Sequence, residues 1–261
     1  MISAIIPCRN RAPLLYRAIE SCLVVGVNEI IVIDDGSDSE LCSSQPLVKI
    51  IRNETSQGAQ NCRIAGLQVA TNEYCIFLDS DDELHPTFLD NACAFIKSFP
   101  MVYGNTLRNN SVIRRYDSSG DYRKYLFKNL SLAPFSGLLV NRIHIDYDLL
   151  SKEIRAWQDD DFIIVLTRKH APKYIDIVSN ISHVSEDSIS RSKSNQIEGL
   201  KTLLKKYKRE IIHSNGHTHY YIFWKIRLLI LEIENKNRPT QNLMAKALRL
   251  AVSPFFNHIS S

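Results

Sequence analysis

Short apolar runs alternate with segments of helical periodicity over the first hundred residues of the chain. The apolar runs cover residues 3–7, 29–33, 48–51 and 74–78, and they predict buried strands. Apolar residues recur at helical spacing from Pro13 to Leu23, from Gly58 to Ala70 and from Pro86 to about Phe99. Strands that alternate with helices predict βαβ units and a mainly parallel central sheet, so the expected fold class is α/β.

The rest of the chain is less regular. Residues 101–107 and 111–116 predict a hairpin, and residues 138–140 predict another short strand. An apolar helix is expected from Phe162 to Leu166, and helices again after about Ser194. We therefore expect a Rossmann-like domain at residues 1–195 and a helical C-terminal extension at residues 196–261.

Charge is distributed unevenly along the 261 residues. The net charge is +4, yet residues 196–261 hold eleven Lys and Arg against four Asp and Glu. This basic extension predicts contact with an anionic membrane surface, with Tyr220, Tyr221, Phe223 and Trp224 exposed to add burial at the interface. The alternative is a helical cap packed on the domain. Nucleic acid is not an expected partner, because the overall charge is modest and no recognition motif occurs.

Cysteine usage and the N-terminus indicate the compartment. The six cysteines include no CxxC pair, which argues against a zinc site. The chain opens without a basic n-region or cleavage motif, and no apolar run is long enough to span a bilayer. We expect a cytoplasmic protein with free thiols, associated peripherally with the inner face of the plasma membrane through its extension.

Two acidic motifs follow predicted strands. Asp34-Asp35-Gly36-Ser37 follows the strand at 29–33, and Asp79-Ser80-Asp81-Asp82 follows the strand at 74–78. In open α/β sheets ligands bind beyond the carboxyl ends of the strands, so both motifs are expected at one ligand-binding edge.

Each motif allows two interpretations. The D-x-D pair of the second motif offers hard oxygen ligands to Mg²⁺ or Mn²⁺, with a diphosphate completing the shell, or it is an acidic loop that favours the next helix N-terminus. The first motif either accepts hydrogen bonds from a base or a ribose, or forms a turn.

Four ordered segments resemble the family 2 glycosyltransferases of the GT-A fold. They are Ile5–Arg11, Ile31–Ser37, Gln57–Leu67 and Glu73–Asp82. The resemblance is clear over residues 2 to about 90 and weaker to about 192. In the third segment Arg63 keeps the arginine that is common in the family, whereas Ile64 replaces an asparagine.

The resemblance implies roles for particular residues. Asp35 is expected to contact a uracil-like base, and Asp79 and Asp81 to hold Mn²⁺ or Mg²⁺, with Asp81 nearest the metal. The full set of implied donor-binding residues is Pro7, Arg9, Asp34, Asp35, Arg63, Asp79 and Ser80.

Two weaker similarities extend into the second half of the chain. The segment from Trp157 to Phe162 is similar to the family's Glu-Asp motif, which implies Asp159 as the general base, with Asp160 as the alternative register. His183 resembles the family's His-x-x-Ser element and is implied as a metal ligand, although four residues separate it from Ser188.

Together these features predict an inverting, metal-dependent glycosyltransferase. It would move a sugar from a UDP-sugar to a hydroxyl of a glycan acceptor, carried on a lipid at the membrane, in surface-polysaccharide assembly. One alternative is a nucleotidyltransferase that makes activated sugars, but the first loop, Pro7–Arg11, has no glycine. Another is a non-catalytic nucleotide-sugar-binding module, but such a module is expected to have lost the acidic motifs.

Overall fold

The computed structural model describes residues 1–129, 132–183, 192–213, 218–235 and 246. The chain forms two compact units. The sheet unit comprises Met1–Tyr122, Ser131–Glu153 and Asp159–Glu186, and the helical unit comprises Arg123–Leu130, Ile154–Gln158 and Asp187–Ser261. The predicted domain boundary after residue 195 stays a prediction.

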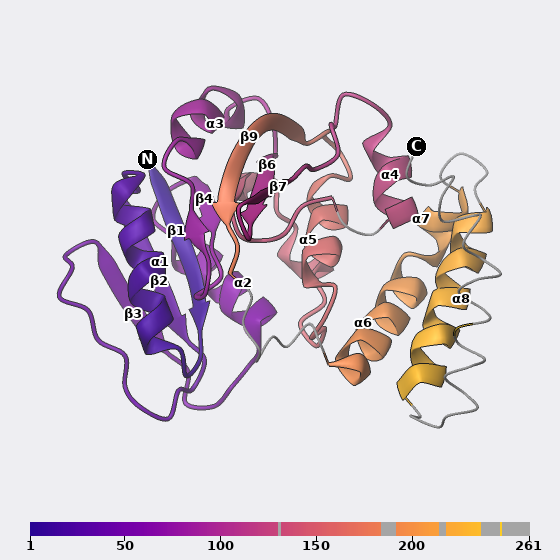
Figure 1. Ribbon diagram of the computed structural model, residues 1–261, viewed down its shortest axis with the longest axis horizontal. Coiled ribbons are helices and arrows are strands. Elements are labelled where there is room, and N and C mark those ends of the chain that lie inside the picture. Colours follow the sequence, from indigo (N-terminus) through magenta and orange to yellow (C-terminus); the bar gives the residue numbers. More distant parts are fainter. Residues whose placement is uncertain (130–131, 184–191, 214–217, 236–245, 247–261) are drawn as a thin grey trace. The chain divides into compact units, whose positions relative to one another are not determined.

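The described part of the sheet unit contains one nine-stranded sheet, whose first half is parallel (Figure 1). The strands of this half, in sheet order, are β3 (Val48–Arg52), β2 (Glu29–Asp34), β1 (Ile2–Cys8) and β4 (Tyr74–Phe77). Cys8 lies beside Asp34, and Asp34 beside Arg52, so the carboxyl ends of β1, β2 and β3 are level. The predicted α/β class with its mainly parallel sheet is confirmed.

The second half of the sheet mixes directions. Its strands are β8 (Leu138–Asn141), β6 (Met101–Arg108), β9 (Lys173–Ile181), β5 (Glu83–Leu84) and β7 (Ser111–Ile113). β8 runs antiparallel to both β4 and β6, and β6 runs parallel to β9. The predicted hairpin is β6–β7, and it turns through Asn109 and Asn110, whose φ angles of 49° and 58° suit asparagine.

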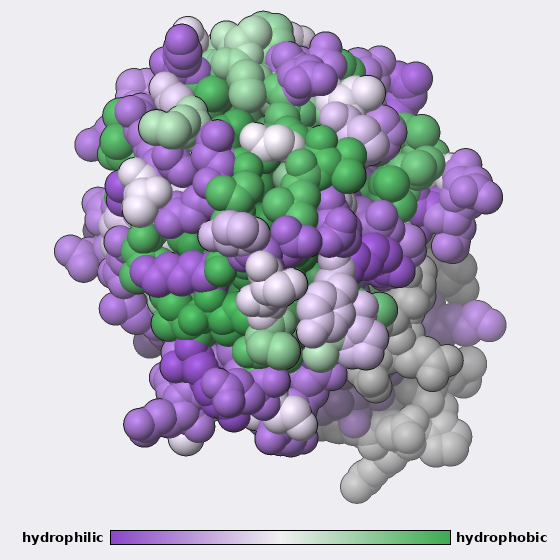
Figure 2. All heavy atoms as spheres, turned by 90° about the vertical axis from the view of Figure 1, so that its left-hand side faces the viewer, coloured by the Kyte–Doolittle hydropathy of each residue, from purple (hydrophilic) through white to green (hydrophobic). Residues whose placement is uncertain are grey.

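Helices cover both faces of the parallel half. Alternate side chains of β1, β2 and β4 pack against α1 (Ala12–Val24) and α3 (Phe88–Ile96) in one core cluster. On the opposite face lie α2 (Ala59–Val69) and α5 (Gln158–Leu166), where Phe77 of β4 packs edge-on against Phe162 at 5.2 Å between ring centroids. A side chain at Gly66 of α2 would collide with Ile5 of β1, its Cβ lying 2.4 Å from Cγ2, so glycine permits this close approach. Figure 2 shows apolar surface bordered by polar residues on the side of the molecule that faces left in Figure 1.

The helical unit is built around a tryptophan. Its helices are α4 (Tyr122–Asn129), α6 (Lys193–Lys206), α7 (Lys208–His213) and α8 (Thr218–Asn235). Trp224 of α8 is fully buried, and its Nε1 donates to the carbonyl oxygen of Phe127 at 2.7 Å. Trp157 packs edge-on against Trp224 and donates to the carbonyl oxygen of Gln196. In the part of the chain that the structure describes, every helix is too short or too polar to traverse a bilayer.

Three sequence predictions need correction. The helix expected from Pro86 begins at Phe88 and ends at Ile96, because residues 83–84 form β5 on β9 and the His85 amide donates to Ser179. Neither β5 nor β9 was foreseen. The predicted exposure of the four aromatic side chains of the extension is wrong, because Tyr220 and Trp224 are buried and Tyr221 and Phe223 are partly buried. Residues 236–245 and 247–261 of the basic extension lie outside the described residues.

Gln60 is a buried polar residue of the sheet unit whose side-chain amide is not satisfied. Gln60, in the first turn of α2, is 1% exposed, and neither Nε2 nor Oε1 has a hydrogen-bond partner among the described residues. A buried amide that loses its water without gaining a partner costs free energy of folding. Gln60 is therefore a destabilising residue in the ligand-free chain.

We predict that Gln60→Met raises the free energy of unfolding by about 1–2 kcal/mol, because methionine matches the shape and helix propensity of glutamine without its polar atoms. Denaturant titration measures the change. The control is Gln68→Met on the exposed side of the same helix, which should shift stability by less than about 0.5 kcal/mol. A clear loss of stability in Gln60→Met alone would show that the amide is satisfied.

Candidate functional site

The carboxyl ends of β1, β2 and β4 deliver three loops to one edge of the sheet. Because these strands are parallel, the segments 9–11, 34–38 and 79–82 all leave it on the same side. Asn10, with φ 54°, joins the first two loops: its amide nitrogen donates to Ser37 Oγ at 2.9 Å, and its side chain bonds Asp38 in both directions. Both acidic motifs therefore lie at the edge where the sequence placed them.

The Asp34 and Asp35 carboxylates are buried and bonded within the protein. Asp34 accepts from the Ser37 amide and from Arg52 Nη1, at 2.9 and 2.8 Å. Asp35 accepts four hydrogen bonds of 2.7–3.0 Å from the segment 53–58, two of them from backbone amides. Burial alone would raise the pKa of Asp35, but these bonds outweigh it and hold the pKa below its usual value. Asp35 is thus an ionised anchor for the loop before α2, and its contact with a base stays a prediction.

Two arginines from different elements neutralise the D-x-D carboxylates. Arg63 of α2 reaches Asp79 Oδ1 with Nη2 at 2.5 Å, while its guanidinium stacks on the Phe135 ring. Arg11, at the start of α1, reaches Asp81 Oδ2 with Nη1 at 2.7 Å. Arg17 adds a bond of 2.7 Å from Nη2 to the carbonyl oxygen of Asp81. The loop is therefore held by cationic side chains that converge on it from α1 and α2.

The third carboxylate of this loop shows how much negative charge is concentrated here. Asp82 is 7% exposed. Burial, together with the negative charges of Asp79 and Asp81, raises its pKa to about 6, although hydrogen bonds from Ser136 and the His183 amide act in the opposite direction. Ser80 is also buried and lies against the Cys8 thiol at the end of β1. A cation at this loop would relieve the repulsion among the three carboxylates.

His183 lies beside the acidic loop, at the end of β9. Its amide nitrogen donates to Asp82 Oδ1 at 3.0 Å, and its Nε2 is 2.7 Å from Glu83 Oε1. Ser188, the other half of the motif, is outside the described residues. The structure thus brings His183 to the loop but pairs its ring with Glu83, and its role as a metal ligand stays a prediction.

The first turn of α5 carries three carboxylates with different surroundings. Asp159 is partly buried, and the Asp160 amide donates to it at 3.1 Å. Burial raises the pKa of Asp159, and the charge of Asp79 adds to the rise while Arg63 opposes it. Asp160 is 2% exposed, and Asp161 is fully buried and accepts from Ser151. Asp159 is therefore the most exposed carboxylate of this turn. It is also close enough to Asp79 and Arg63 for their charges to shift its pKa.

The remaining predicted donor residues differ in exposure. Pro7 is partly buried in β1 opposite Ile33, next to the Cys8–Asp34 pair. Arg9 is exposed and, among the described residues, has no side-chain partner. Sequence reasoning missed the parts played by Arg11, Arg17 and Asn10. Arg11 stands in the motif segment Ile5–Arg11, but its pairing with Asp81, seventy residues away, leaves no local signal.

The residues present fit a divalent metal only in part. Within the described ranges, no group of three or more His, Cys, Asp or Glu side chains is arranged to hold an ion. Asp79 and Asp81 supply hard oxygen ligands of the kind that Mg²⁺ and Mn²⁺ prefer, but both are paired with arginines. A metal would therefore need further oxygen ligands from a bound molecule, and a diphosphate provides them.

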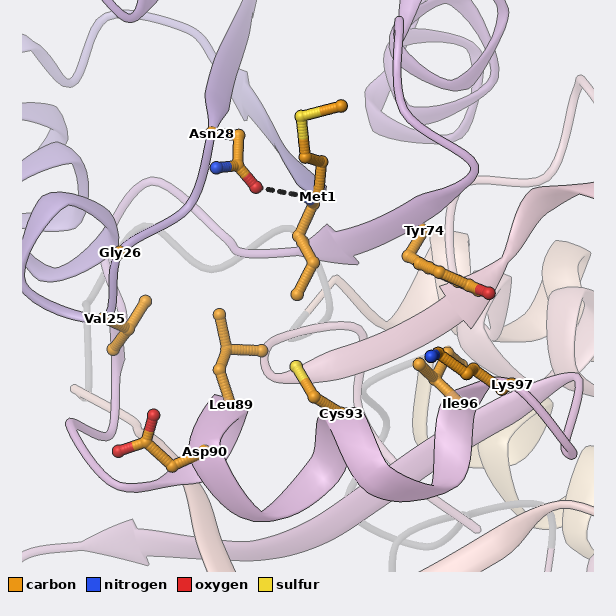
Figure 3. A pocket seen from close by; sticks show the side chains of 11 residues that line it. Met1, Val25, Gly26, Asn28, Tyr74, Leu89, Asp90, Cys93, Ile96 and Lys97 are labelled. Atoms are coloured by element: carbon orange, nitrogen blue, oxygen red, sulfur yellow. Dashed lines mark hydrogen bonds between the residues drawn. The ribbon is translucent and has the colours of Figure 1, made fainter.

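A separate cavity of about 430 Å³ lies at the opposite edge of the sheet (Figure 3). Leu89, Cys93 and Ile96 line it from α3, with Met1 and Tyr74 near the starts of β1 and β4. None of the predicted site residues lines this cavity. The chemistry-bearing residues gather instead at the carboxyl edge.

Comparison with known proteins finds similarity to bacterial glycosyltransferases. An uncharacterised glycosyltransferase of Haemophilus influenzae is 25% identical over 186 residues, which cover 65% of this chain and 63% of the relative. A PGL/p-HBAD biosynthesis glycosyltransferase of Mycobacterium bovis is 28% identical over 141 residues, 49% of this chain and 55% of the relative. The chain thus spans less than two thirds of these relatives.

Solved structures share the fold. The crystal structure of S. aureus TarS residues 1–349 in complex with UDP-GlcNAc matches with a TM-score of 0.59 at 15% identity, covering 89% of this chain and 72% of that one. The complex of the same protein with UDP has the same TM-score and identity, and covers 98% of this chain and 77% of that one.

The family model described as glycosyl transferase family 2 matches residues 3–146, more than half of the chain. This range holds both acidic motifs and the arginines that neutralise them. The chain therefore belongs to glycosyl transferase family 2.

Proposed function

We propose that this chain transfers a sugar from a UDP-sugar to a hydroxyl of a glycan acceptor, with inversion at the anomeric carbon. The observation that carries the proposal is the gathering of the D-x-D carboxylates and Asp159 at the carboxyl edge of the sheet, where the pKa of Asp159 responds to Asp79. A carboxylate base close to a metal-and-diphosphate site is the arrangement that direct displacement of a nucleotide by a hydroxyl requires.

The donor half of the site is proposed to bind the nucleotide between two loops. The nucleobase lies near Pro7, Arg9 and the segment anchored by Asp35, and the diphosphate lies near Asp79 and Asp81. These two carboxylates would hold Mn²⁺ or Mg²⁺, and His183 is a further candidate ligand. When bound, the metal supplies positive charge that stabilises the departing diphosphate. Support for uridine comes from the shared fold of TarS, whose structures contain UDP and UDP-GlcNAc.

The acceptor half of the proposed site depends on Asp159. Its carboxylate takes the proton from the acceptor hydroxyl as that oxygen attacks the anomeric carbon. Asp160 is the alternative base, but its side chain is almost completely buried in α5. A base whose pKa is raised holds the proton more firmly once it has accepted it, which favours the transfer.

The pathway is proposed to be surface-polysaccharide or glycolipid assembly, in line with the name of the mycobacterial relative. A nucleotidyltransferase fits less well, because the loop after β1 has no glycine to cradle a triphosphate. A purely binding module also fits less well, because both acidic motifs and Asp159 are present at the carboxyl edge.

We predict that Asp159→Asn slows transfer by roughly 10²–10⁴-fold while UDP still binds, because an amide cannot accept the proton. In the native chain the rate should fall as the pH drops through the raised pKa of Asp159, since only the ionised form is a base. Release of UDP from UDP-sugars, measured from pH 5 to 8, gives the rate of the variant and the pH dependence of the native chain.

The matched control for this prediction is Asp160→Asn in the same turn. It should keep most of the activity if the protein folds, which circular dichroism and UDP binding would establish. An inactive Asp160→Asn beside a fully active Asp159→Asn would move the base by one residue.

We also propose that the helical unit holds the enzyme at an anionic membrane where a lipid-linked acceptor resides. Support comes from exposed basic side chains on α6, α7 and α8, among them Lys205, Lys208 and Lys225, and from exposed Ile222 and Leu229 on α8. The expected result is co-sedimentation with phosphatidylglycerol vesicles at low salt and release as salt rises. A charge-reversed Lys205→Glu, Lys208→Glu variant should bind less. Absence of binding by the native chain at low salt would contradict the proposal.

A further inference from the structure

The cavity at the amino ends of β1 and β4 is large enough to hold a small molecule. Its volume is about 430 Å³, and ligand pockets in proteins measure roughly 300–1,000 Å³. The apolar part of the lining comes from Ile2, Val25, Leu89 and Ile96, with Tyr74 at one side (Figure 3). Ile2, Leu89 and Ile96 also belong to the core between β1 and α3, so the packing of the core holds this apolar lining in place.

Two opposite charges lie along the same side of α3, one toward each end of the cavity. Asp90 and Lys97 are seven residues apart, close to two helical turns, so they share one face of the helix and are separated by about 10 Å along its axis. Cys93 lies between them, about one turn from each, and Figure 3 shows the three side chains in this order. The cavity therefore has an apolar middle with a carboxylate at one end and an ammonium at the other.

Neither of these two charges is paired within the described part of the chain. Asp90 and Lys97 are both exposed and form no hydrogen bond or ion pair with another described residue. Their positions suit the helix dipole, because Asp90 lies in the first turn of α3 and Lys97 follows its last turn. That interaction leaves both charged groups open to a ligand.

We propose that this cavity binds an elongated zwitterion with an apolar middle, whose cationic end pairs with Asp90 and whose anionic end pairs with Lys97. A short apolar peptide with free termini has this chemistry, because three extended residues span about 10 Å. Its peptide groups need polar partners, and Asn28 on the cavity lining offers one. Asn28 Oδ1 accepts from the Ile2 amide at 2.8 Å, and Nδ2 remains to donate to a carbonyl oxygen of the ligand. The site is separate from the carboxyl edge and does not depend on the proposed transfer reaction.

The two ends of the ligand and its middle contribute differently to binding. Burial of the apolar middle against the core residues supplies the general attraction. Each charge pair adds less, because Asp90 and Lys97 are exposed and water screens them. A chain with both charges should therefore bind more tightly than a chain of the same length with one charge, by roughly two- to fivefold.

Cys93 makes occupancy of the cavity measurable in the native chain. Cys93 and Cys42 are the exposed cysteines, the other four are buried, and Cys42 does not line the cavity. Alkylation of each thiol by iodoacetamide is followed by mass spectrometry while trileucine or 8-aminooctanoate is titrated. With the probe at about four times its Kd, alkylation of Cys93 should slow about fivefold, because the bound probe covers the thiol. The rate at Cys42 should not change.

Matched probes and variants test whether the cavity recognises both charges. Octanoate and octylamine each lack one charge of 8-aminooctanoate and should bind more weakly. Lys97→Glu and Asp90→Lys each leave two like charges along the cavity and should weaken the binding of 8-aminooctanoate. The double variant Asp90→Lys, Lys97→Glu again has one charge of each sign and should recover binding with the probe reversed. Thermal melting checks folding, because the new charges oppose the dipole of α3.

Protection of Cys93 by zwitterions, lost in both single variants and recovered in the double variant, supports the proposal. Protection by trileucine alone assigns the ligand to peptides, and protection by 8-aminooctanoate alone assigns it to alkyl zwitterions. Equal binding of octanoate, octylamine and 8-aminooctanoate would show that the charges are not recognised and would overturn the proposal. Alkylation of Cys93 that neither zwitterion slows at millimolar concentration would overturn it as well.

Discussion

Negative charge crowded into one short loop is the constraint on which the rest of the site depends. Asp79, Asp81 and Asp82 lie within four residues, and burial together with the charges of Asp79 and Asp81 raises the pKa of Asp82 to about 6. Such a loop persists in a folded protein only if positive groups are brought to it. Arg11, at the start of α1, and Arg63, in α2, supply this positive charge through ion pairs with Asp81 and Asp79. The two helices are far apart in the sequence.

The sheet determines why these groups can meet. Strands β1, β2 and β4 are parallel and buried on both faces, so their carboxyl ends present loops on one side while the helices between them return across the faces. Gly66 lets α2 approach β1 closely, which brings Arg63 within reach of Asp79. The start of α5 then adds Asp159. In the proposed function, donor binding thus belongs to the strand-end loops and proton transfer to the start of a helix.

The sequence was informative wherever the pattern was local. Apolar runs located the four parallel strands, and their ends located both acidic motifs at one edge, because strand direction alone dictates that placement. Long-range pairing was not predictable, as the Arg11–Asp81 and Arg63–Asp79 bonds show. Strand β9 was missed because Ser179 and Asn180 interrupt its apolar pattern. Both residues are buried and form hydrogen bonds with polar groups of β6. The burial of Trp224 was missed because aromatic residues suit a membrane interface and a packed core equally well.

The central claim is that the acidic edge binds a nucleoside diphosphate through a metal held by the D-x-D carboxylates. Calorimetric titration of UDP into the native chain with Mn²⁺, into the same chain in EDTA, and into Asp81→Asn with Mn²⁺ tests it most directly. The account predicts one UDP bound per chain with Mn²⁺, and affinity weakened by roughly tenfold or more both in EDTA and in the variant. Equal affinity under all three conditions, or tighter binding of GDP or CDP than of UDP, would contradict it.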